Sequence, residues 1–190
     1  VGNEDLETEK VTSYDVTIGY KNLKATYFYN KIKNLIEYVD GTTGFDNIDG
    51  TSKIKGIELS YLHNLTNDLL INLDYSYIDA REDDGTRLAR RPYNKIGFSI
   101  DYYGIKNLHL NLNGIHTGHM QDRKYNPVTY GYDTIDTGRF TVLNTTGTYS
   151  INKNLDAYFK IDNFTDRKYQ MVYNASSYGR TYYSGIKYRF

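Results

Sequence analysis

The chain has 190 residues, a length that suits a single architecture, and its 23 Lys and Arg balance 23 Asp and Glu to a formal net charge of zero. This balance gives no support to a nucleic-acid partner, which needs a basic surface, and the lack of cysteine excludes disulfides, thiolate metal sites and cysteine nucleophiles. The 22 tyrosines argue against a disordered segment, and no apolar run approaches the ~20 residues of a membrane-spanning helix.

Apolar and polar residues alternate with a period of two along most of the chain. From Leu69 the apolar side chains occupy the odd positions, and the same alternation returns from Ile96 and from Leu155. Since successive side chains of a strand point to opposite faces, each segment has one apolar and one polar face. The predicted strands are nine: 10–20, 22–39, 50–63, 68–81, 90–103, 107–122, 138–151, 155–169 and 179–190.

The links between the predicted strands alternate in length. Short links, rich in Asn, Gly and Lys as tight hairpin turns require, are 21–22, 63–67, 104–107 and 152–154. Long links, polar and rich in Gly and Asp, are 40–50, 82–89, 121–137 and 170–178. Bacterial transmembrane barrels sort their links in this way, with short turns at one end and long loops at the other. The sequence therefore predicts an all-β, antiparallel up-and-down transmembrane β-barrel rather than a soluble sandwich.

The positions of the aromatic and charged residues fit this prediction. Tyr14 and Tyr20 bracket one apolar stretch, and Tyr182 and Tyr188 lie on the apolar side of the last predicted strand. Amphipathic rings occupy such positions at the two membrane interfaces. The polar sides of the strands would face the interior, where we expect Asp74, Lys95, Asp101, Asp156 and Lys160.

Six motifs in order resemble the C-terminal part of the TonB-dependent outer-membrane receptors. The closing ones are residues 162–169, the Gly179-Arg180 pair with Tyr178 in place of a common proline, and the final run from Gly185 to Phe190. Earlier ones are residues 25–36, 55–58 and Arg90-Arg91-Pro92, while residues 3–15 give a weaker match because both family prolines are replaced. The tail is most similar to the cobalamin and catecholate-siderophore branch.

The resemblance covers residues 1–190 and implies the last nine strands of a 22-stranded barrel, without its plug. It implies an outer-membrane receptor of a Gram-negative-type bacterium that imports a ferric siderophore, haem or cobalamin with energy from TonB. The implied partners are outer-membrane lipid, TonB through the plug, the barrel-assembly machinery and the metal chelate or cobalamin. No cofactor is implied. Gly185, Tyr188 and Phe190 would belong to the strand that signals barrel assembly. A passive porin or an adhesin, built as a small barrel from this chain, is the alternative.

Tyrosines and arginines of the long links are the predicted ligand contacts. Aromatic rings give broad contact to flat or macrocyclic ligands, and arginine forks bind anionic groups. Each tyrosine would equally suit the lipid interface. The predicted contacts are Tyr125, Tyr130, Tyr132, Arg139, Tyr173, Tyr178 and Arg180.

No catalytic motif and no metal site is predicted. His116 and His119 lie three residues apart, so a strand points them to opposite faces and they make a poor chelate. An outer-membrane hydrolase, the third class considered, would need an acid beside a histidine, and His109 with Asp101 or Asp74 is the arrangement to examine. The acidic run 82–85 has oxygen ligands suited to calcium, but a solvated turn is the favoured interpretation.

Overall fold

The computed structural model describes residues 3–39 and 44–190. All regular structure in these ranges is β-structure, and they contain no helix with the length and apolarity needed to cross a membrane. The strands are β1 (Lys10–Tyr20), β2 (Leu23–Lys33), β3 (Ile36–Val39), β4 (Gly44–Asn47), β5 (Thr51–Asn64), β6 (Leu69–Arg81), β7 (Asn94–Ile105), β8 (Leu108–Asn126), β9 (Gly131–Ser150), β10 (Leu155–Asp162) and β11 (Thr181–Tyr188).

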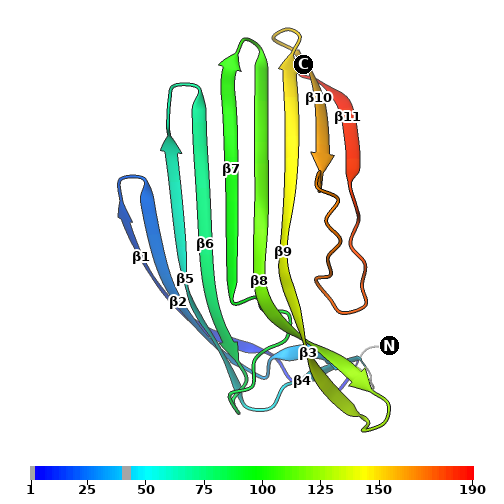
Figure 1. Cartoon of the computed structure of the whole chain (residues 1–190). Coiled ribbons are helices and arrows are strands. Elements are labelled where there is room, and N and C mark those ends of the chain that lie inside the picture. The colour runs from blue at the N-terminus through cyan, green and yellow to red at the C-terminus, as the bar shows by residue number, and fades with distance from the viewer. Residues whose placement is uncertain (1–2, 40–43) are drawn as a thin grey trace.

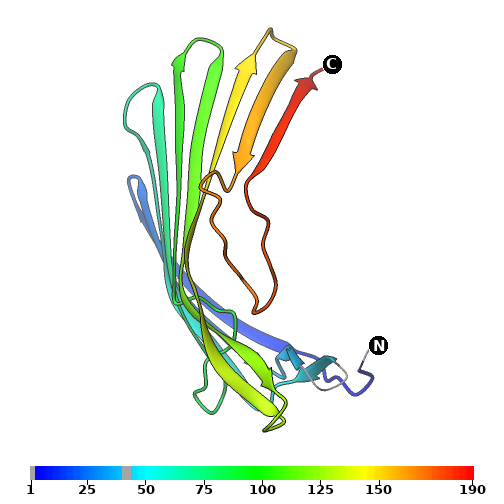
Figure 2. The ribbon, with the colours of Figure 1, turned by 45° about the vertical axis from the view of Figure 1, so that its right-hand side comes forward.

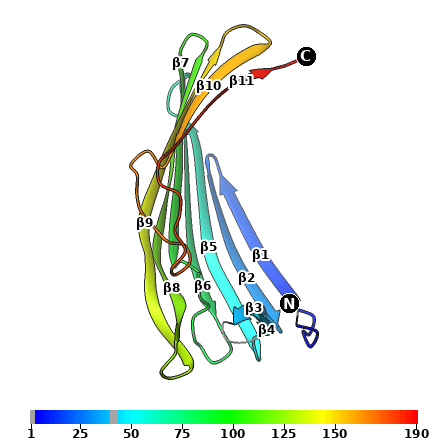
Figure 3. The ribbon, with the colours of Figure 1, turned by 90° about the vertical axis from the view of Figure 1, so that its right-hand side faces the viewer.

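Nine of these strands form one antiparallel sheet in the order β1-β2-β5-β6-β7-β8-β9-β10-β11, and β3 pairs with β4 in a separate small sheet (Figure 1). The short turns lie at one end of the large sheet and the long links at the other, which we call the turn end and the loop end. The sheet is bowed along its strands (Figures 2 and 3). In the part of the chain that is described, β1 and β11 each have a single neighbour, so the sheet is an open wall. The predicted nine-stranded antiparallel meander is confirmed.

The pairing register brings the apolar sides of all nine strands onto one face of the sheet, the apolar face. Across β1, β2 and β5, for example, Val16 pairs with Tyr27 and Tyr27 with Ile57. An exposed apolar surface of this extent must be covered by lipid or by a partner. Its exposed large side chains include Tyr14, Val16, Ile18, Tyr20, Leu23, Tyr27, Ile57, Leu59, Tyr61, Leu73, Tyr75, Tyr77, Ile96, Tyr102, Leu110, Tyr149, Phe159, Tyr182, Ile186 and Tyr188.

Hydrogen-bonded polar side chains cover the opposite face. The Asp101 carboxylate accepts hydrogen bonds from Ser99 at 3.0 Å and from Asn111 at 2.8 Å. The chain of contacts continues through Asn113, which donates to Asn111 at 2.7 Å, to Asn144, which donates to Asn113 at 3.0 Å. The register also places on this face the five charged residues predicted for the interior: Asp74, Lys95, Asp101, Asp156 and Lys160.

Three predicted strand boundaries are wrong, and left-handed residues explain each one. The predicted strand 22–39 stops at Lys33 because Asn34 has a φ of 56°, after which the chain forms the β3–β4 hairpin. Asn163, with a φ of 50°, ends β10 well before residue 169. β7 begins at Asn94 instead of residue 90, because Arg90 has a φ of 59°. Asparagine tolerates this conformation better than most residues, but an asparagine in the sequence does not by itself show that the chain turns at that position.

The predicted long link 121–137 is also wrong. β8 and β9 instead continue as a paired hairpin as far as Asn126 and Gly131, beyond the neighbouring strands (Figure 2). The hairpin contains Gly138, whose φ is 84° and whose position for a Cβ lies 2.1 Å from the carbonyl oxygen of Gly118. Only glycine fits such a close approach of two backbones. The extension carries side chains of β8 and β9 to the loop end.

Candidate ligand-binding site

A small apolar cluster fixes the long links at the loop end. Ile32, Leu35, Ala80 and Leu88 are buried together, and Leu88 and Ala80 have no exposed surface. The backbone N–H of Leu88 donates to the carbonyl of Ala80 at 3.1 Å, and that of Ile48 donates to Leu35 at 2.7 Å. Link 82–93 and the β3–β4 hairpin are therefore folded against the sheet rather than extended into solvent.

A cavity of about 580 Å³ opens at this end of the sheet. Four segments distant in sequence form its walls: the β3–β4 hairpin, the link before β7, the end of the β8–β9 hairpin and the loop between β10 and β11. The lining residues are Ile36, Glu37, Tyr38, Phe45, Ala89, Arg90, Arg91, Arg123, Lys124, Tyr125, Tyr132, Tyr173 and Asn174.

The charge of the lining residues is strongly positive. Arg90, Arg91, Arg123 and Lys124 face the cavity with a single carboxylate, that of Glu37. Burial raises the pKa of Glu37, and the neighbouring Arg91 and Arg123 act in the opposite direction. A cavity with this excess of cations favours an anionic ligand.

One buried carboxylate, that of Asp122, holds three of the walls together. Its Oδ1 lies 2.8 Å from Nε of Arg90 and accepts the backbone N–H of Arg123 at 2.8 Å. Its Oδ2 accepts the backbone N–H of Tyr173 at 2.6 Å. Asp122 has no exposed surface, so these contacts replace its hydration. Arg123 is held a second time by an ion pair with Glu82.

Aromatic rings complete the lining. The rings of Tyr125 and Tyr132 meet edge to face at a centroid distance of 5.9 Å across the β8–β9 hairpin. Tyr38 and Phe45 meet in the same manner at 5.6 Å across the β3–β4 hairpin. Nζ of Lys124 lies 5.8 Å from the centroid of Tyr173. Rings beside cations suit a ligand that combines flat groups with negative charge.

Three of the seven predicted ligand contacts, Tyr125, Tyr132 and Tyr173, come together in this cavity. The other four lie elsewhere. Tyr130, at the tip of the β8–β9 hairpin, and Tyr178 are 83% and 88% exposed. Arg139 is exposed beside Gly138, and the backbone of Arg180 donates to Asp166 at 2.8 Å, away from the cavity lining.

Sequence reasoning missed the cations of the cavity. The sequence marks Arg90 and Arg91 only as part of a motif, and its predicted strand 22–39 places Glu37 and Tyr38 in continuous β-structure. The available signal was the charged pair Arg90-Arg91 directly before a predicted strand, at the loop end. No local signal marks Asp122, because its partner Arg90 is 32 residues away. Positions 40–43 of the predicted link 40–50 lie outside the described residues.

The predicted contact of His109 with Asp101 is present, at 2.7 Å between Nε2 and Oδ1, whereas Asp74 accepts instead from Asn72 at 2.7 Å. Ser99 donates to Asp101 and not to His109, so the order of nucleophile, base and acid that a hydrolase needs is not made. His109 is stacked on Tyr103 at 4.5 Å. These groups belong to the polar network of the sheet.

The other candidate ionic groups have local partners. His116 lies 3.0 Å from Oγ1 of Thr141, and His119 stacks on Tyr93 at 5.3 Å. In the acidic run 82–85, the backbone N–H and the hydroxyl of Thr86 bind the Asp84 carboxylate and lower its pKa. Across residues 3–39 and 44–190, no group of three or more His, Cys, Asp or Glu side chains is arranged to hold a metal ion.

The predicted assembly strand is the outer edge of the sheet. Gly185 in β11 faces Tyr158 of β10, and a Cβ at Gly185 would lie 2.7 Å from the Tyr158 hydroxyl. Tyr188 lies on the apolar face, and its ring meets that of Phe190 edge to face at 5.2 Å. The strand thus presents an aromatic end at the turn end of the wall.

Comparisons with known proteins agree with this architecture. Residues 1–164 match the family described as TonB dependent receptor-like, beta-barrel. The siderophore receptor PirA from Acinetobacter baumannii superposes with a TM-score of 0.78 at 18% identity, over 100% of this chain and 33% of that one. The ferric enterobactin receptor PfeA from Pseudomonas aeruginosa gives 0.77 at 20%, over 100% and 32%. The pyoverdine outer membrane receptor FpvA from Pseudomonas aeruginosa, bound to pyoverdine, gives 0.75 at 18%, over 97% and 30%. The chain thus spans about a third of the length of these receptors.

Proposed function

Because this chain belongs to the TonB-dependent receptor β-barrel family, we propose that it forms the last nine strands, and part of the ligand site, of an outer-membrane receptor that imports a ferric siderophore. The proposal places the apolar face in the lipid of a Gram-negative-type outer membrane and the loop end at the cell surface. The family membership and the fold shared with siderophore receptors support it. No enzymatic activity is proposed.

The observation that carries the proposal is the composition of the loop-end cavity. Four cations and several aromatic rings face a volume of about 580 Å³ together with the carboxylate of Glu37. Asp122 and Glu82 pair with Arg90 and Arg123, so Arg91 and Lys124 supply most of the positive charge that is left for a ligand. An anionic iron chelate with aromatic or other flat groups matches both properties. Haem shares part of this chemistry, whereas cobalamin lacks the net negative charge that would complement these cations. The ligand class favoured here is therefore the ferric siderophore.

Transport would require parts that lie outside this chain. By family, a plug would close the barrel and contact TonB, which would supply the energy for import. The open edges of β1 and β11 support a larger barrel, because a strand in lipid needs backbone partners on both sides. A small passive pore made from this chain alone would have to close by pairing β1 with β11, which are not paired in the described sheet.

The test measures binding of an iron-labelled catecholate siderophore to cells that express the complete receptor. Arg91→Ala combined with Lys124→Ala removes two cavity cations while leaving the Asp122 contacts intact. We expect a loss of affinity of roughly tenfold or more, from two charge-assisted contacts. The matched control, Lys106→Ala with Lys153→Ala at the turn end, should bind as the wild type does. Equal binding by both double variants would contradict the proposed site.

A further inference from the structure

Cationic side chains gather on the apolar face at the loop end of β1, β2, β5 and β6. The register pairs Lys10 with Lys33 and Lys31 with Lys53, and it pairs Lys53 with Arg81. Residues paired in this way project from the same face of a sheet. Lys55, two positions from Lys53, shares that face. All six side chains are exposed. We call Lys10, Lys31, Lys33, Lys53, Lys55 and Arg81 the cation patch.

These pairings are unfavourable by themselves. Like charges directly opposite each other on neighbouring strands destabilise a sheet, and the patch contains three such pairs. At the loop-end positions of this face that are described on β1, β2, β5 and β6, the single acidic side chain is Asp79. The patch therefore keeps a surplus of positive charge that an anion from outside the chain would compensate.

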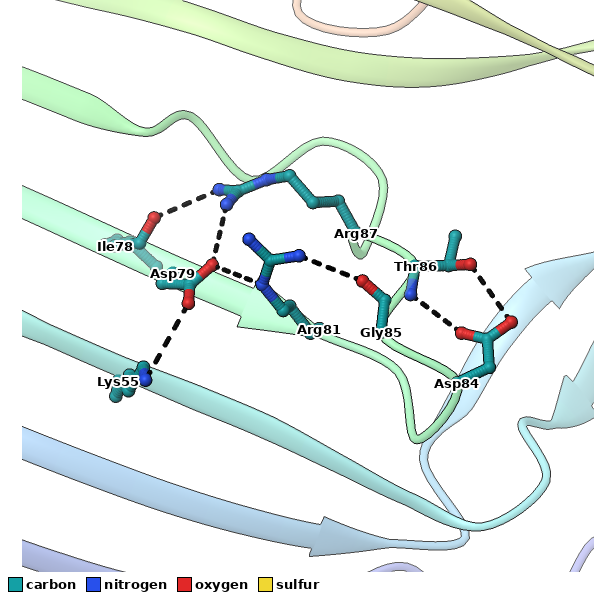
Figure 4. A network of polar contacts seen from close by, with 8 residues as sticks. All are labelled: Lys55, Ile78, Asp79, Arg81, Asp84, Gly85, Thr86 and Arg87. Carbon is teal, nitrogen blue, oxygen red and sulfur yellow. Dashed lines mark hydrogen bonds and ion pairs between the residues drawn. The ribbon is translucent and has the colours of Figure 1, made fainter.

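Asp79 organises one side of the patch (Figure 4). Its Oδ1 lies 2.9 Å from Nε of Arg81 and 2.9 Å from Nη1 of Arg87, and its Oδ2 lies 4.0 Å from Nζ of Lys55. Arg81 also donates to the carbonyl of Gly85 at 3.1 Å. The buried Arg87 lies 3.4 Å over the ring of Tyr93. One carboxylate thus holds three cations, and the side chains of Arg81 and Lys55 remain 48% and 54% exposed.

The patch lies at the border of the apolar surface. In β2, Lys33 is ten positions from Leu23 at the turn end. With a rise of ~3.3 Å per residue and a tilt of ~40°, ten residues span about 25 Å, the height of the lipid-facing band of a membrane barrel. Tyr14 and Tyr29 are paired in the register, and Tyr29 is also paired with Lys55, so these tyrosines lie along the inner border of the patch, where an interfacial aromatic belt is expected. The cations therefore lie at headgroup level on the loop side.

The rest of the sheet lacks this feature at the loop end of the same face. There the register pairs His116 of β8 with Thr141 of β9. At the end of β10, Ile161 pairs with Tyr182, and Arg180, whose Nη1 lies 3.5 Å from the Tyr182 hydroxyl, is a single cation without a like-charged neighbour in the register. The charge is thus concentrated on the first four strands of the large sheet and is no general property of its rim.

We propose that the cation patch binds the phosphate groups of a phosphorylated lipid in the leaflet on the loop side, with the acyl chains of that lipid against the apolar face. The inference rests on the membrane placement in the proposed function. Arginine forks and lysine ammonium groups are the usual ligands for phosphate. The patch is continuous with the lipid-facing surface, so an occupant with both a phosphate head and apolar chains fits it better than a free anion does.

The experiment measures lipid binding by the complete purified receptor in detergent, by native mass spectrometry. The probes are diphosphorylated lipid A, the same lipid with its phosphates removed, and inorganic pyrophosphate. The wild type is expected to prefer the diphosphorylated lipid strongly. Lys31→Gln with Lys53→Gln and Arg81→Gln should reduce that preference on the order of a hundredfold, because each cation near a membrane surface strengthens the binding of anionic lipid several-fold. Lys21→Gln with Lys106→Gln and Lys153→Gln, three cations at the turn end, is the matched control and should retain it.

Three results would overturn the inference: equal affinity of the wild type for the two lipids, an unchanged preference in the patch variant, or complete displacement of the lipid by pyrophosphate. Glutamine keeps most of the side-chain stem and relieves like-charge repulsion, so the patch variant should fold. Binding of the iron chelate is measured in the same samples. A patch variant that loses the lipid preference but binds the chelate normally separates this inference from the proposed function. The proposed function is tested on its own by chelate binding to the wild type and to the variant with Arg91→Ala and Lys124→Ala.

Discussion

The two cationic regions at the loop end, the cavity and the cation patch, are built in opposite ways. In the cavity, Arg90 and Arg123 each have a carboxylate partner, Asp122 and Glu82, and aromatic rings lie beside the cations. In the patch, lysines oppose lysines, and the carboxylate of Asp79 contacts Lys55 and Arg81 while also pairing with Arg87 outside the patch. Cations fixed in one geometry discriminate between ligands by shape, whereas exposed lysines respond mainly to the charge of a ligand. The first arrangement suits a particular chelate, and the second suits a class of headgroups.

The largest expected effect comes from breaking the support of the cavity. Asp122→Ala would leave Arg90 and the backbone N–H groups of Arg123 and Tyr173 without their acceptor, at a cost of about 3 kcal/mol to local stability. We expect faster proteolysis of the loop between β10 and β11 and a loss of chelate binding in the complete receptor. Asp133→Ala, an exposed acid of the same hairpin, is the control, and similar behaviour of the two variants would show that Asp122 has no special role.

The second largest effect is expected from a change to the backbone of the β8–β9 hairpin. Gly138→Ala places a Cβ against the Gly118 carbonyl at a positive φ, which we expect to cost about 2 kcal/mol. Gly85→Ala has a similar φ of 89° but meets open space, so it should cost about 1 kcal/mol. Hydrogen exchange of the hairpin amides measures the difference. Chelate binding should weaken only in the Gly138 variant, because that hairpin carries Tyr125 and Tyr132.

Ligand binding to the two regions should differ in its dependence on salt concentration. The patch is exposed, so raising the ionic strength from about 0.05 M to about 0.5 M should reduce its preference for phosphorylated lipid roughly tenfold. Binding of the chelate in the partly enclosed cavity should fall less, by about threefold, because enclosed charges are less screened. Parallel titrations with the same receptor preparation provide the measurement, and equal salt slopes would remove the distinction between the regions.

The smallest expected effect is the pH dependence that Glu37 gives to the cavity. Its pKa is raised by burial, so the carboxyl becomes neutral at a higher pH than an ordinary glutamate as the pH falls. Loss of that negative charge makes the cavity more positive, and affinity for an anionic chelate should rise as the pH falls through this pKa. Glu37→Gln should bind about fivefold more tightly at neutral pH. The ratio of variant to wild-type affinity should approach one at low pH, and a ratio that stays constant with pH would contradict the assignment.

The faces of the sheet were predictable from the sequence because alternation is a local property. Leu69, Ile71 and Leu73 lie on the apolar face and Asp74 and Asp101 on the polar face, as their positions predict. The predicted contact between His109 and Asp101 also follows from two strands joined by a short turn. A short link leaves few possible registers for the two strands that it joins. Contacts between such strands can therefore be predicted mainly from whether each residue occupies an odd or an even position in its strand.

The site was less predictable because it depends on contacts between distant segments. Asp122 and Arg90, or Glu82 and Arg123, meet only after several strands have paired. The extension of β8 to Asn126 was missed because a polar hairpin and a polar loop have similar compositions. The cation patch shows an intermediate case. The face of each lysine follows from parity, but its opposite neighbour follows only from the register.

The shared carboxylate of Asp122 also has a kinetic consequence. Three walls of the cavity are tied to this one group, so no wall can separate from the others without exposing a buried charge or an unpaired N–H. Displacement of Tyr173 by a ligand would therefore transmit force to Arg90 and to the β8–β9 hairpin. The walls should relax together, with a single rate constant in a stopped-flow experiment, and a bound chelate should dissociate in one phase.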